Sequence, residues 1–421
     1  MKRLFFIFLI IPILFCQCNA NSSNHSDEKN KLSIESFENK KIGEESGEIE
    51  EIPIYTTDAP VNNNLSEIAS NIDFVWLDFD PPLNDFHISS VELSEDNIFL
   101  ASAGDIKSYD MDGKFIQHIG RSGMGPQEYI NISFPLQLDR SKQLIYASDL
   151  NRQRVVVYRY NGTFVQSFQL INGALAIIDS SMIALRQSLY DRQLKPAPLI
   201  KFITHDGKVL KTIWSKNYPI SQMTRLLGPD MSPLWSFKNR FYYLEYGTDT
   251  IFNIMSNSLL PARILTGELK LSLNEHYLEK TGNKLRLSTP IQRFNAGIFE
   301  SNRIMIFRLS NDYERFFIVY NKDIQSLHRT RHENPLQSPR GDVKWHDFFV
   351  DDMISGLNFN PQYQSMDKAI ALIPAAEICK KRQEILDFIA KHPSDQSTSL
   401  KQIVENFTED HNSLMMMVTF K

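Results

Sequence analysis

Short apolar runs separated by turn residues recur along most of the chain, a pattern typical of β-strands. The clearest unit is an apolar or aromatic residue, a turn with Asp-Gly or Asn-Gly, and two adjacent apolar residues. It occurs at Tyr109–Ile116 (turn Asp112, Gly113), Tyr158–Val165 (Asn161, Gly162) and Thr204–Leu210 (Asp206, Gly207). Because Gly, Asn and Asp tolerate positive φ, such a two-residue loop joins two strands in a hairpin. The pattern predicts three hairpins with positive φ at both central residues.

The spacing of these hairpins predicts the architecture. The three glycines lie 49 and 45 residues apart, a period typical of a β-propeller built from four-stranded antiparallel blades. Degenerate copies extend from Thr250 to Ile264 and from Phe316 to Leu327. Roughly 370 residues follow the N-terminal region, which suits six blades. The sequence therefore predicts an all-β, six-bladed propeller over residues 51–421.

Apolar runs between the hairpins predict the inner strands of the blades. These runs are Asn97–Ala101, Leu144–Ala147 and Arg240–Leu244. The run Val155–Tyr158 lacks clean alternation, because a strand held between neighbouring blades can be apolar on both faces.

The C-terminal region has a different period. Apolar residues recur at helical spacing within Ala375–Lys391 and again from Leu400 to Phe407, which predicts two short amphipathic helices. The apolar run Leu414–Phe420 follows them. We expect it to lie in the closing blade, because a blade shared by both ends of the chain removes exposed strand edges.

The N-terminus predicts export. A basic start is followed by the apolar run Leu4–Phe15, which is too short to span a bilayer and is typical of a signal peptide. A cysteine at the end of such a run resembles the lipobox of bacterial lipoproteins, in which the lipidated cysteine becomes the new N-terminus. Cys18 is the favoured lipid attachment site and Cys16 the alternative, and an ordinary cleaved signal remains open. Residues 1–17 are then the signal peptide and residues 18–50 a polar, disordered tether.

Cysteine content and charge narrow the partners. Cys379 is the only cysteine outside the signal region, so no disulfide framework is expected. The formal net charge is −5, and loss of Lys2 and Arg3 with the signal makes it more negative. No nucleic-acid partner is expected, because binding nucleic acid requires a basic face. The basic clusters His328–His332 and Lys380–Arg382 are interpreted as a solvated turn and a polar helix face.

Residues Asp105–Phe168 resemble the six-bladed β-propeller lipoproteins of Bacteroidetes, which are related to NHL-type propellers. The resemblance is carried by Tyr109–Tyr129, by Ile145–Asp149 and by the next hairpin. The segment Ile52–Thr57 is similar to the family's opening strand, and the last strand to its usual ending. The resemblance implies the fold and a cell-envelope location, and it implies no established activity.

The side of the membrane is read from the residues after the cysteine. Lipoproteins of these bacteria that reach the cell surface often carry acidic residues directly after it, whereas here Asn19–Asn24 precede Asp27. The resemblance therefore implies a lipid anchor in the outer membrane facing the periplasm, with the cell surface as the alternative.

Three segments were weighed as ligand sites. The loop Gly120–Tyr129 contains glycines and Arg121 but lacks the P-loop pattern, so we expect a tight blade-to-blade connection. His328 and His332 lack helical spacing and a third ligand, so no metal site is assigned. The acidic runs Asp78–Asp80 and Asp347–Asp352 lack the spacing of a calcium loop and are interpreted as solvated loops.

No catalytic, cofactor-binding or metal-binding residue is assigned, and no cofactor is expected. Serine nucleophile elbows and sialidase boxes are absent from the sequence. The tryptophans would form a sugar-stacking platform if they met, although most propeller tryptophans wedge between blades; they are Trp76, Trp214, Trp235 and Trp345.

The leading hypothesis is a non-enzymatic module that binds an envelope protein or a glycan. One alternative is a hydrolase or lyase with a carboxylate or metal site in the central channel. Three or more acidic, His or Asn side chains converging at the channel mouth would favour it. Another is a structural assembly factor of an envelope complex.

Overall fold

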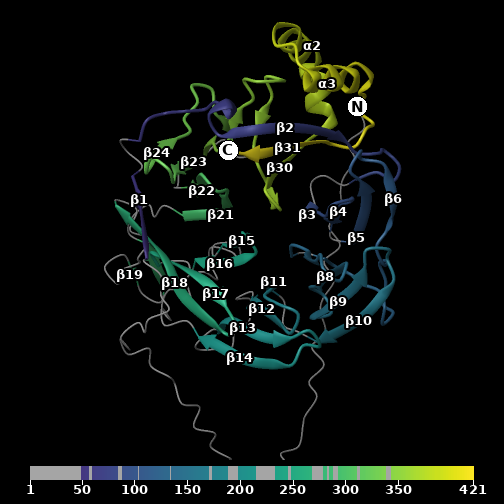
Figure 1. Ribbon diagram of the computed structural model, residues 1–421, viewed down its shortest axis with the longest axis vertical. Coiled ribbons are helices and arrows are strands. Elements are labelled where there is room, and N and C mark those ends of the chain that lie inside the picture. The colour runs from purple at the N-terminus through teal and green to yellow at the C-terminus, as the bar shows by residue number, and fades with distance from the viewer. Residues whose placement is uncertain are drawn as a thin grey trace, which may run out of the picture. The chain divides into compact units, whose positions relative to one another are not determined.

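The computed structural model describes residues 49–55, 59–83, 88–102, 104–132, 134–169, 173–187, 198–214, 233–244, 248–267, 278–281, 284–287, 293–310, 313–337 and 343–421. These residues form a six-bladed β-propeller of four-stranded antiparallel sheets with two helices near the C-terminus, as the sequence predicts (Figure 1). The expected signal peptide, both candidate lipidation sites and almost all of the tether lie outside the described residues. Within the described ranges, no helix has the length and apolar character needed to cross a membrane.

Blades 1 to 3 follow one another along the chain. Blade 1 consists of β3 (Ile88–Leu93), β4 (Asn97–Ser102), β5 (Asp105–Asp110) and β6 (Phe115–His118). Blade 2 consists of β7 (Gln137–Asp139), β8 (Leu144–Asp149), β9 (Arg154–Arg159) and β10 (Phe164–Gln169). Blade 3 consists of β11 (Gly173–Ile177), β12 (Met182–Gln187), β13 (Pro198–Thr204) and β14 (Val209–Trp214).

Blades 4 and 5 carry additional strands. Blade 4 consists of β15 (Leu234–Phe237), β16 (Arg240–Leu244), β17 (Thr250–Met255) and β18 (Ser258–Gly267), and β1 (Glu50–Ile54) pairs in parallel with β18. Blade 5 contains β21 (Arg293–Glu300), β22 (Ile304–Ser310), β23 (Glu314–Asn321) and β24 (Ser326–Arg329), extended by β26 (Lys344–His346) and β25 (Leu336–Gln337). Two small hairpins are formed by β19 (Leu278–Thr281) with β20 (Lys284–Leu287) and by β27 (Phe349–Val350) with β28 (Asn358–Phe359).

Blade 6 joins the two ends of the propeller. Its strands, from the inside outwards, are β29 (Tyr363–Ser365), β30 (Lys368–Ile373), β31 (Leu414–Phe420) and β2 (Ala69–Trp76). Leu414 lies opposite Trp76 on one side and Ile373 on the other. The expected closure by the C-terminal strand is confirmed, and its outer partner is β2, which the sequence analysis had not identified. The segment similar to an opening strand instead lies in β1, on the edge of blade 4.

The three repeated hairpins connect the third and fourth strands of blades 1 to 3. In the first, the Gly113 N–H donates to the Asp110 carbonyl (3.1 Å) and the Asp110 N–H to the Lys114 carbonyl (2.9 Å), and the other two copies match. The φ angles are +87° at Gly113, +79° at Gly162 and +90° at Gly207, and the residue before each glycine does not share this conformation. The prediction of positive φ at both central residues is therefore wrong. The turn is a three-residue loop that closes with one left-handed glycine.

The repeated glycine also lies where each blade touches the one before it. A Cβ atom on Gly113 would lie 2.1 Å from the Trp76 carbonyl oxygen of β2. A Cβ on Gly207 would lie 2.6 Å from the Phe168 ring of β10. Both the positive φ and this close approach to the preceding outer strand require glycine.

The hydrophobic core is divided among the blade interfaces. Each of the six apolar clusters of the described residues contains residues from two neighbouring blades. Val155 and Val157 face blade 3, whereas Val156 and Tyr158 face blade 1. This arrangement explains why the run Val155–Tyr158 is apolar throughout.

Two helices are inserted between β30 and β31. They are α2 (Ala375–Lys391) and α3 (Asp395–Asn406), and a short 3₁₀ helix, η1 (Leu65–Glu67), precedes β2. The buried residues Ile378, Ile385 and Leu400 join the apolar cluster between blades 5 and 6. Ser394 caps α3 through a capping box with Ser397. The amphipathic pattern thus attaches both helices to the closing blade (Figure 1).

Candidate functional site

A cavity of about 420 Å³ opens at the outer rim of the closing blade. We call it the rim groove. It lies between β2, the turn that joins β5 to β6, and α3. Its lining residues are Phe74, Val75, Trp76, Asp78, Met111, Asp112, Lys114 and Ile403.

The edge of β2 forms the floor of the rim groove. Successive side chains of a strand point to opposite faces of the sheet. A cavity that touches Phe74, Val75 and Trp76 in succession must therefore reach around the strand edge. Among the described strands β2 pairs only with β31, so this edge carries no neighbouring strand.

One wall of the groove is apolar and held by α3. Ile403 of α3 lines it, and the next residue, Val404, is buried in the core beneath. The Trp76 ring lies 5.5 Å from the Phe407 ring and 4.3 Å from the His411 ring, measured between centroids. These contacts fix the position of the indole.

The opposite wall is the hairpin turn of blade 1, which is tied to the chain after β2. The Asp78 N–H donates to the Gly113 carbonyl (2.8 Å), and the Asp78 carboxylate accepts the Phe115 N–H (2.9 Å). The Asp110 carboxylate accepts the N–H groups of Asp112 (3.1 Å) and Lys114 (2.8 Å). Three carboxylates and one ammonium group give this wall a net negative charge.

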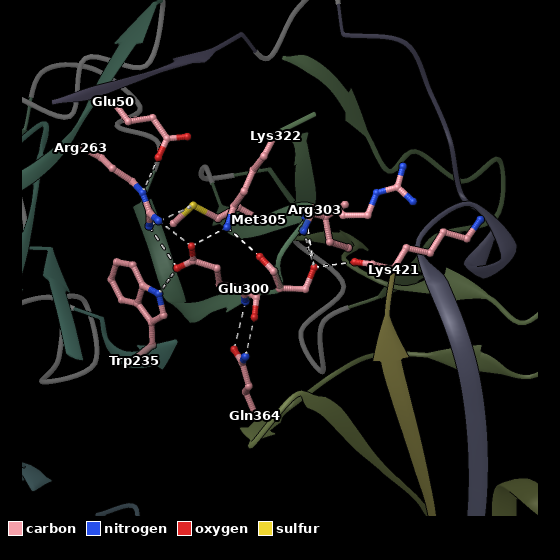
Figure 2. Close-up of polar contacts among 11 residues, drawn as sticks. Glu50, Trp235, Arg263, Glu300, Arg303, Met305, Lys322, Gln364 and Lys421 are labelled. Carbon is pink, nitrogen blue, oxygen red and sulfur yellow. Dashed lines mark hydrogen bonds and ion pairs between the residues drawn. The ribbon is translucent and has the colours of Figure 1, made fainter. Parts of the chain in front are cut away.

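A second polar cluster is buried between blades 4 and 5 and centres on Glu300, the last residue of β21 (Figure 2). Its carboxylate accepts hydrogen bonds from Arg263 (2.7 and 3.1 Å), Trp235 Nε1 (2.8 Å) and Lys322 Nζ (2.6 Å). Both oxygens are occupied and the side chain is fully buried. Burial lowers the pKa of Lys322, against the opposing effect of Glu300.

The Glu300 cluster joins four parts of the propeller. Arg263 of β18 also donates to Glu50 of β1 (2.8 Å). Gln364 of β29 accepts the Glu300 N–H (3.2 Å) and donates to the Glu300 carbonyl (3.0 Å), as Figure 2 shows. Because buried charges must be paired and fully hydrogen-bonded, this arrangement fits a structural link better than a reactive carboxylate.

A third cluster contains a buried carboxyl with a perturbed pKa. Burial raises the pKa of Glu92, in β3, to about 7, although Arg140 and Ser365 oppose the shift. Arg140 Nη2 lies 3.6 Å from the carboxylate, and the Ser365 hydroxyl donates to it (2.8 Å). The three residues come from blades 1, 2 and 6, so the cluster spans the closure of the ring.

Comparison with known proteins identifies the family. Residues 49–419 match a family model described as a domain of unknown function, DUF4934. The chain belongs to the DUF4934 family. No curated protein matches it.

The solved structures similar to this DUF4934 protein share its fold. A Bacteroides fragilis protein described as exported is 15% identical, with a TM-score of 0.62, and the match covers 89% of this chain and 99% of that chain. A member of the DUF4221 family from Bacteroides vulgatus is 14% identical, with a TM-score of 0.43 and coverage of 84% and 97%. A virginiamycin B lyase from Staphylococcus aureus is 12% identical, with a TM-score of 0.35 and coverage of 63% and 76%.

The glycine-rich loop of this DUF4934 protein connects blades 1 and 2 and binds its own carboxylate. Glu128 accepts the Gly125 N–H (2.6 Å) and pairs with Arg121 (2.5 Å). Arg154 donates to the Pro126 carbonyl (2.9 Å). The place that an anion would take is filled by Glu128, which agrees with the expected tight connection.

The acidic run near the C-terminus does not form a solvated loop, and this interpretation is wrong. Asp347 and Asp351 are fully buried. Asp347 lies 3.2 Å from Arg308 and 2.9 Å from Arg315, and burial lowers the pKa of Arg308 to about 10. The Asp351 carboxylate instead accepts backbone N–H groups of the following turn, including that of Ser355 (2.8 Å).

The basic and histidine clusters also differ from a solvated turn. Arg329 is buried and pairs with Glu314 (3.2 Å). Burial lowers the pKa of His328 to about 4. The His332 N–H donates to His346 Nδ1 (3.0 Å), a neighbour that the sequence did not reveal. Within the described ranges, no three His, Cys, Asp or Glu side chains form a group able to hold a metal ion.

The four tryptophans do not form a platform, because they lie on four different blades. Their strands are β2 in blade 6, β14 in blade 3, β15 in blade 4 and β26 in blade 5. Trp235 stacks on Tyr242 and donates to Glu300, and Trp345 packs against the Arg315 guanidinium. Trp76 alone lines the rim groove.

Sequence reasoning missed the rim groove because its walls are far apart in the chain. Trp76, Asp78 and Asp112 were singled out for other reasons, whereas Phe74 and Lys114 were not. The signal available was the alternation of apolar residues at Ile72, Phe74 and Trp76, which is typical of a half-buried strand.

Proposed function

We propose that this DUF4934 protein is an extracytoplasmic, non-enzymatic binding module that recognises its partner at the rim groove. The observation that carries the proposal is the groove itself, an unpaired strand edge held between two fixed walls of different polarity. A closed ring supports it, because a surface that moves little on binding loses little conformational entropy. Such clefts at the junction of several elements are common binding sites.

We further propose a lipid anchor at Cys18, with Cys16 as the alternative, in the outer membrane facing the periplasm. The basic start and the apolar run that ends in these cysteines support export. The similar Bacteroides fragilis protein, described as exported, supports it as well. The anchor would hold the propeller near partners in the cell envelope, where an envelope protein or glycan is the expected ligand.

Site-specific photo-crosslinking in intact cells tests the proposed function. Lys114 is exposed, lines the groove and follows the hairpin glycine of blade 1. Lys208 is exposed at the same position of the blade 3 hairpin and is the matched control. We expect a photoreactive side chain at position 114 to give a discrete adduct and the same group at position 208 to give none.

Two outcomes of this experiment contradict the proposal. One is the absence of an adduct at position 114 in cells where the variant is folded. The other is the same adducts from both positions, which would mean unspecific contact. An adduct to a subunit of a stable envelope complex would favour the assembly-factor alternative. The hydrolase or lyase alternative has no observation in its favour among the described residues.

A further inference from the structure

Resting on the proposed function, we infer that the rim groove binds an extended peptide of alternating apolar and basic residues, which adds to β2 as a fifth strand of blade 6. The first argument is the open edge. β2 is the outermost described strand of its sheet, and alternate backbone N–H and C=O groups of an edge strand point away from the sheet. An extended peptide satisfies these groups by adding a strand.

The blade 1 hairpin covers only one end of this edge. The hydrogen bond from the Asp78 N–H to the Gly113 carbonyl lies just beyond the last residue of β2. Phe74 and Val75 still line the cavity. The peptide would therefore pair along β2 and stop at the hairpin turn.

The molecule already contains this mode of pairing at another blade. β1 adds to the outer strand of blade 4 as a fifth strand, with Glu50 opposite Arg263 and Ile54 opposite Gly267. The side chains of Ile52 and Ile54 are fully buried there. The outer edge of a blade in this fold therefore accepts an additional strand and gives buried positions to its apolar side chains.

The two walls predict the side chains of the peptide. Alternate residues of an added strand face opposite sides of the sheet. On one side they meet the apolar wall of Trp76 and Ile403. On the other they meet the acidic wall with Asp78 and Asp112. Charge complementarity therefore favours Lys or Arg at one set of alternate positions and apolar residues at the other.

A defined peptide tests this inference. The probe is Ac-Val-Lys-Phe-Lys-Val-NH₂ with a fluorescent label, titrated with the full chain by fluorescence anisotropy. The charge control replaces both lysines with glutamate. Two backbone controls carry N-methyl groups on the odd or on the even residues, which removes one alternate set of N–H donors and keeps the side chains.

Strand addition predicts an unequal response to the two backbone controls. We expect the N-methyl set that faces β2 to weaken binding at least tenfold and the other set to change it less than threefold. The glutamate peptide should bind at least tenfold more weakly than the lysine peptide. Equal effects of the two N-methyl sets, or equal affinity of the lysine and glutamate peptides, would overturn the inference.

Protein variants locate the site. Asp112→Lys changes an exposed groove residue whose carboxylate accepts no bond from the turn, and it should weaken the lysine peptide at least tenfold. Asp367→Lys makes the same change in the exposed turn between β29 and β30 and should leave affinity unchanged. Equal effects of both variants would contradict binding in the rim groove.

The outcomes separate this inference from the proposed function. If position 114 gives a protein adduct in cells and the lysine peptide does not bind, the groove is a binding site and its peptide chemistry is wrong. If the adduct is a glycan, strand addition is likewise rejected. If position 114 gives no adduct, the proposed function fails, whatever the peptide does.

Discussion

At the scale of single residues, Glu92 links the stability of the ring to pH. Its pKa is raised from 4.5 to about 7 in the folded protein, chiefly by burial. A carboxyl with a raised folded-state pKa stabilises the fold below its unfolded pKa, and this contribution is lost as the pH rises through about 7. At about 1.4 kcal/mol per pKa unit, ionised Glu92 costs the folded state roughly 1 to 3 kcal/mol above pH 8.

Glu92→Gln should remove this dependence, because the amide keeps a hydrogen-bonding oxygen for Ser365 and carries no charge. We expect the variant to be more stable than the wild type at pH 8 and similar to it at pH 5. Chemical unfolding at both pH values measures the difference. A wild-type advantage at pH 8 would show that the pair with Arg140 outweighs the burial of the carboxylate.

The repeated glycines predict a graded series of substitutions. Gly113 and Gly162 both have positive φ, which costs an alanine about 1 kcal/mol. A Cβ would meet backbone at 2.1 Å at Gly113 and only at 3.2 Å at Gly162. Gly113→Ala should therefore lower the melting temperature more than Gly162→Ala. Equal shifts would mean that the contact with the preceding blade adds nothing.

At the scale of elements, the C-terminal strand holds the closing blade together. β31 lies between β30 and β2, and Leu414 to Val418 are all buried. Each large side chain removed from the core costs roughly 1.5 to 3 kcal/mol. Their sum exceeds the usual stability of a domain, about 5 to 15 kcal/mol.

Truncation after Asn412 should therefore abolish folding of the propeller, whereas removal of exposed Lys421 alone should have little effect. Circular dichroism and size-exclusion chromatography of the two truncated chains check this expectation. A soluble chain ending at Asn412 with an unchanged melting temperature would show that β31 does not close the ring.

The elements also show what the sequence can predict. α2 was predicted with its observed bounds, because a long periodic pattern is unambiguous. The hairpin positions follow from their glycines, whereas the φ of Asp112 was wrong because loop length cannot be read from the Asp-Gly pair. The partner of β2 and the rim groove could not be predicted. They depend on contacts between Asp78, Gly113 and Ile403, which only the closed ring brings together.

At the scale of the whole molecule, the lipid anchor decides where the propeller acts. Each buried CH₂ group of an acyl chain contributes about 0.8 kcal/mol to membrane binding. Cys18→Ala should release the protein from membranes or block its maturation. Labelling with a fatty-acid analogue and membrane fractionation measure both effects. Retained label in Cys18→Ala, together with loss of label in Cys16→Ala, would assign the anchor to Cys16.

Amide hydrogen exchange of the full chain tests the central claim, that the partner is recognised at the rim groove, most directly. The exchange is compared in the free protein and in the presence of the captured partner. We predict slower exchange in Ala69–Trp76 and in the turn around Asp112, with no change in the equivalent outer strands β6 and β10. Protection of β6 or β10 with unchanged exchange in β2 would contradict the account.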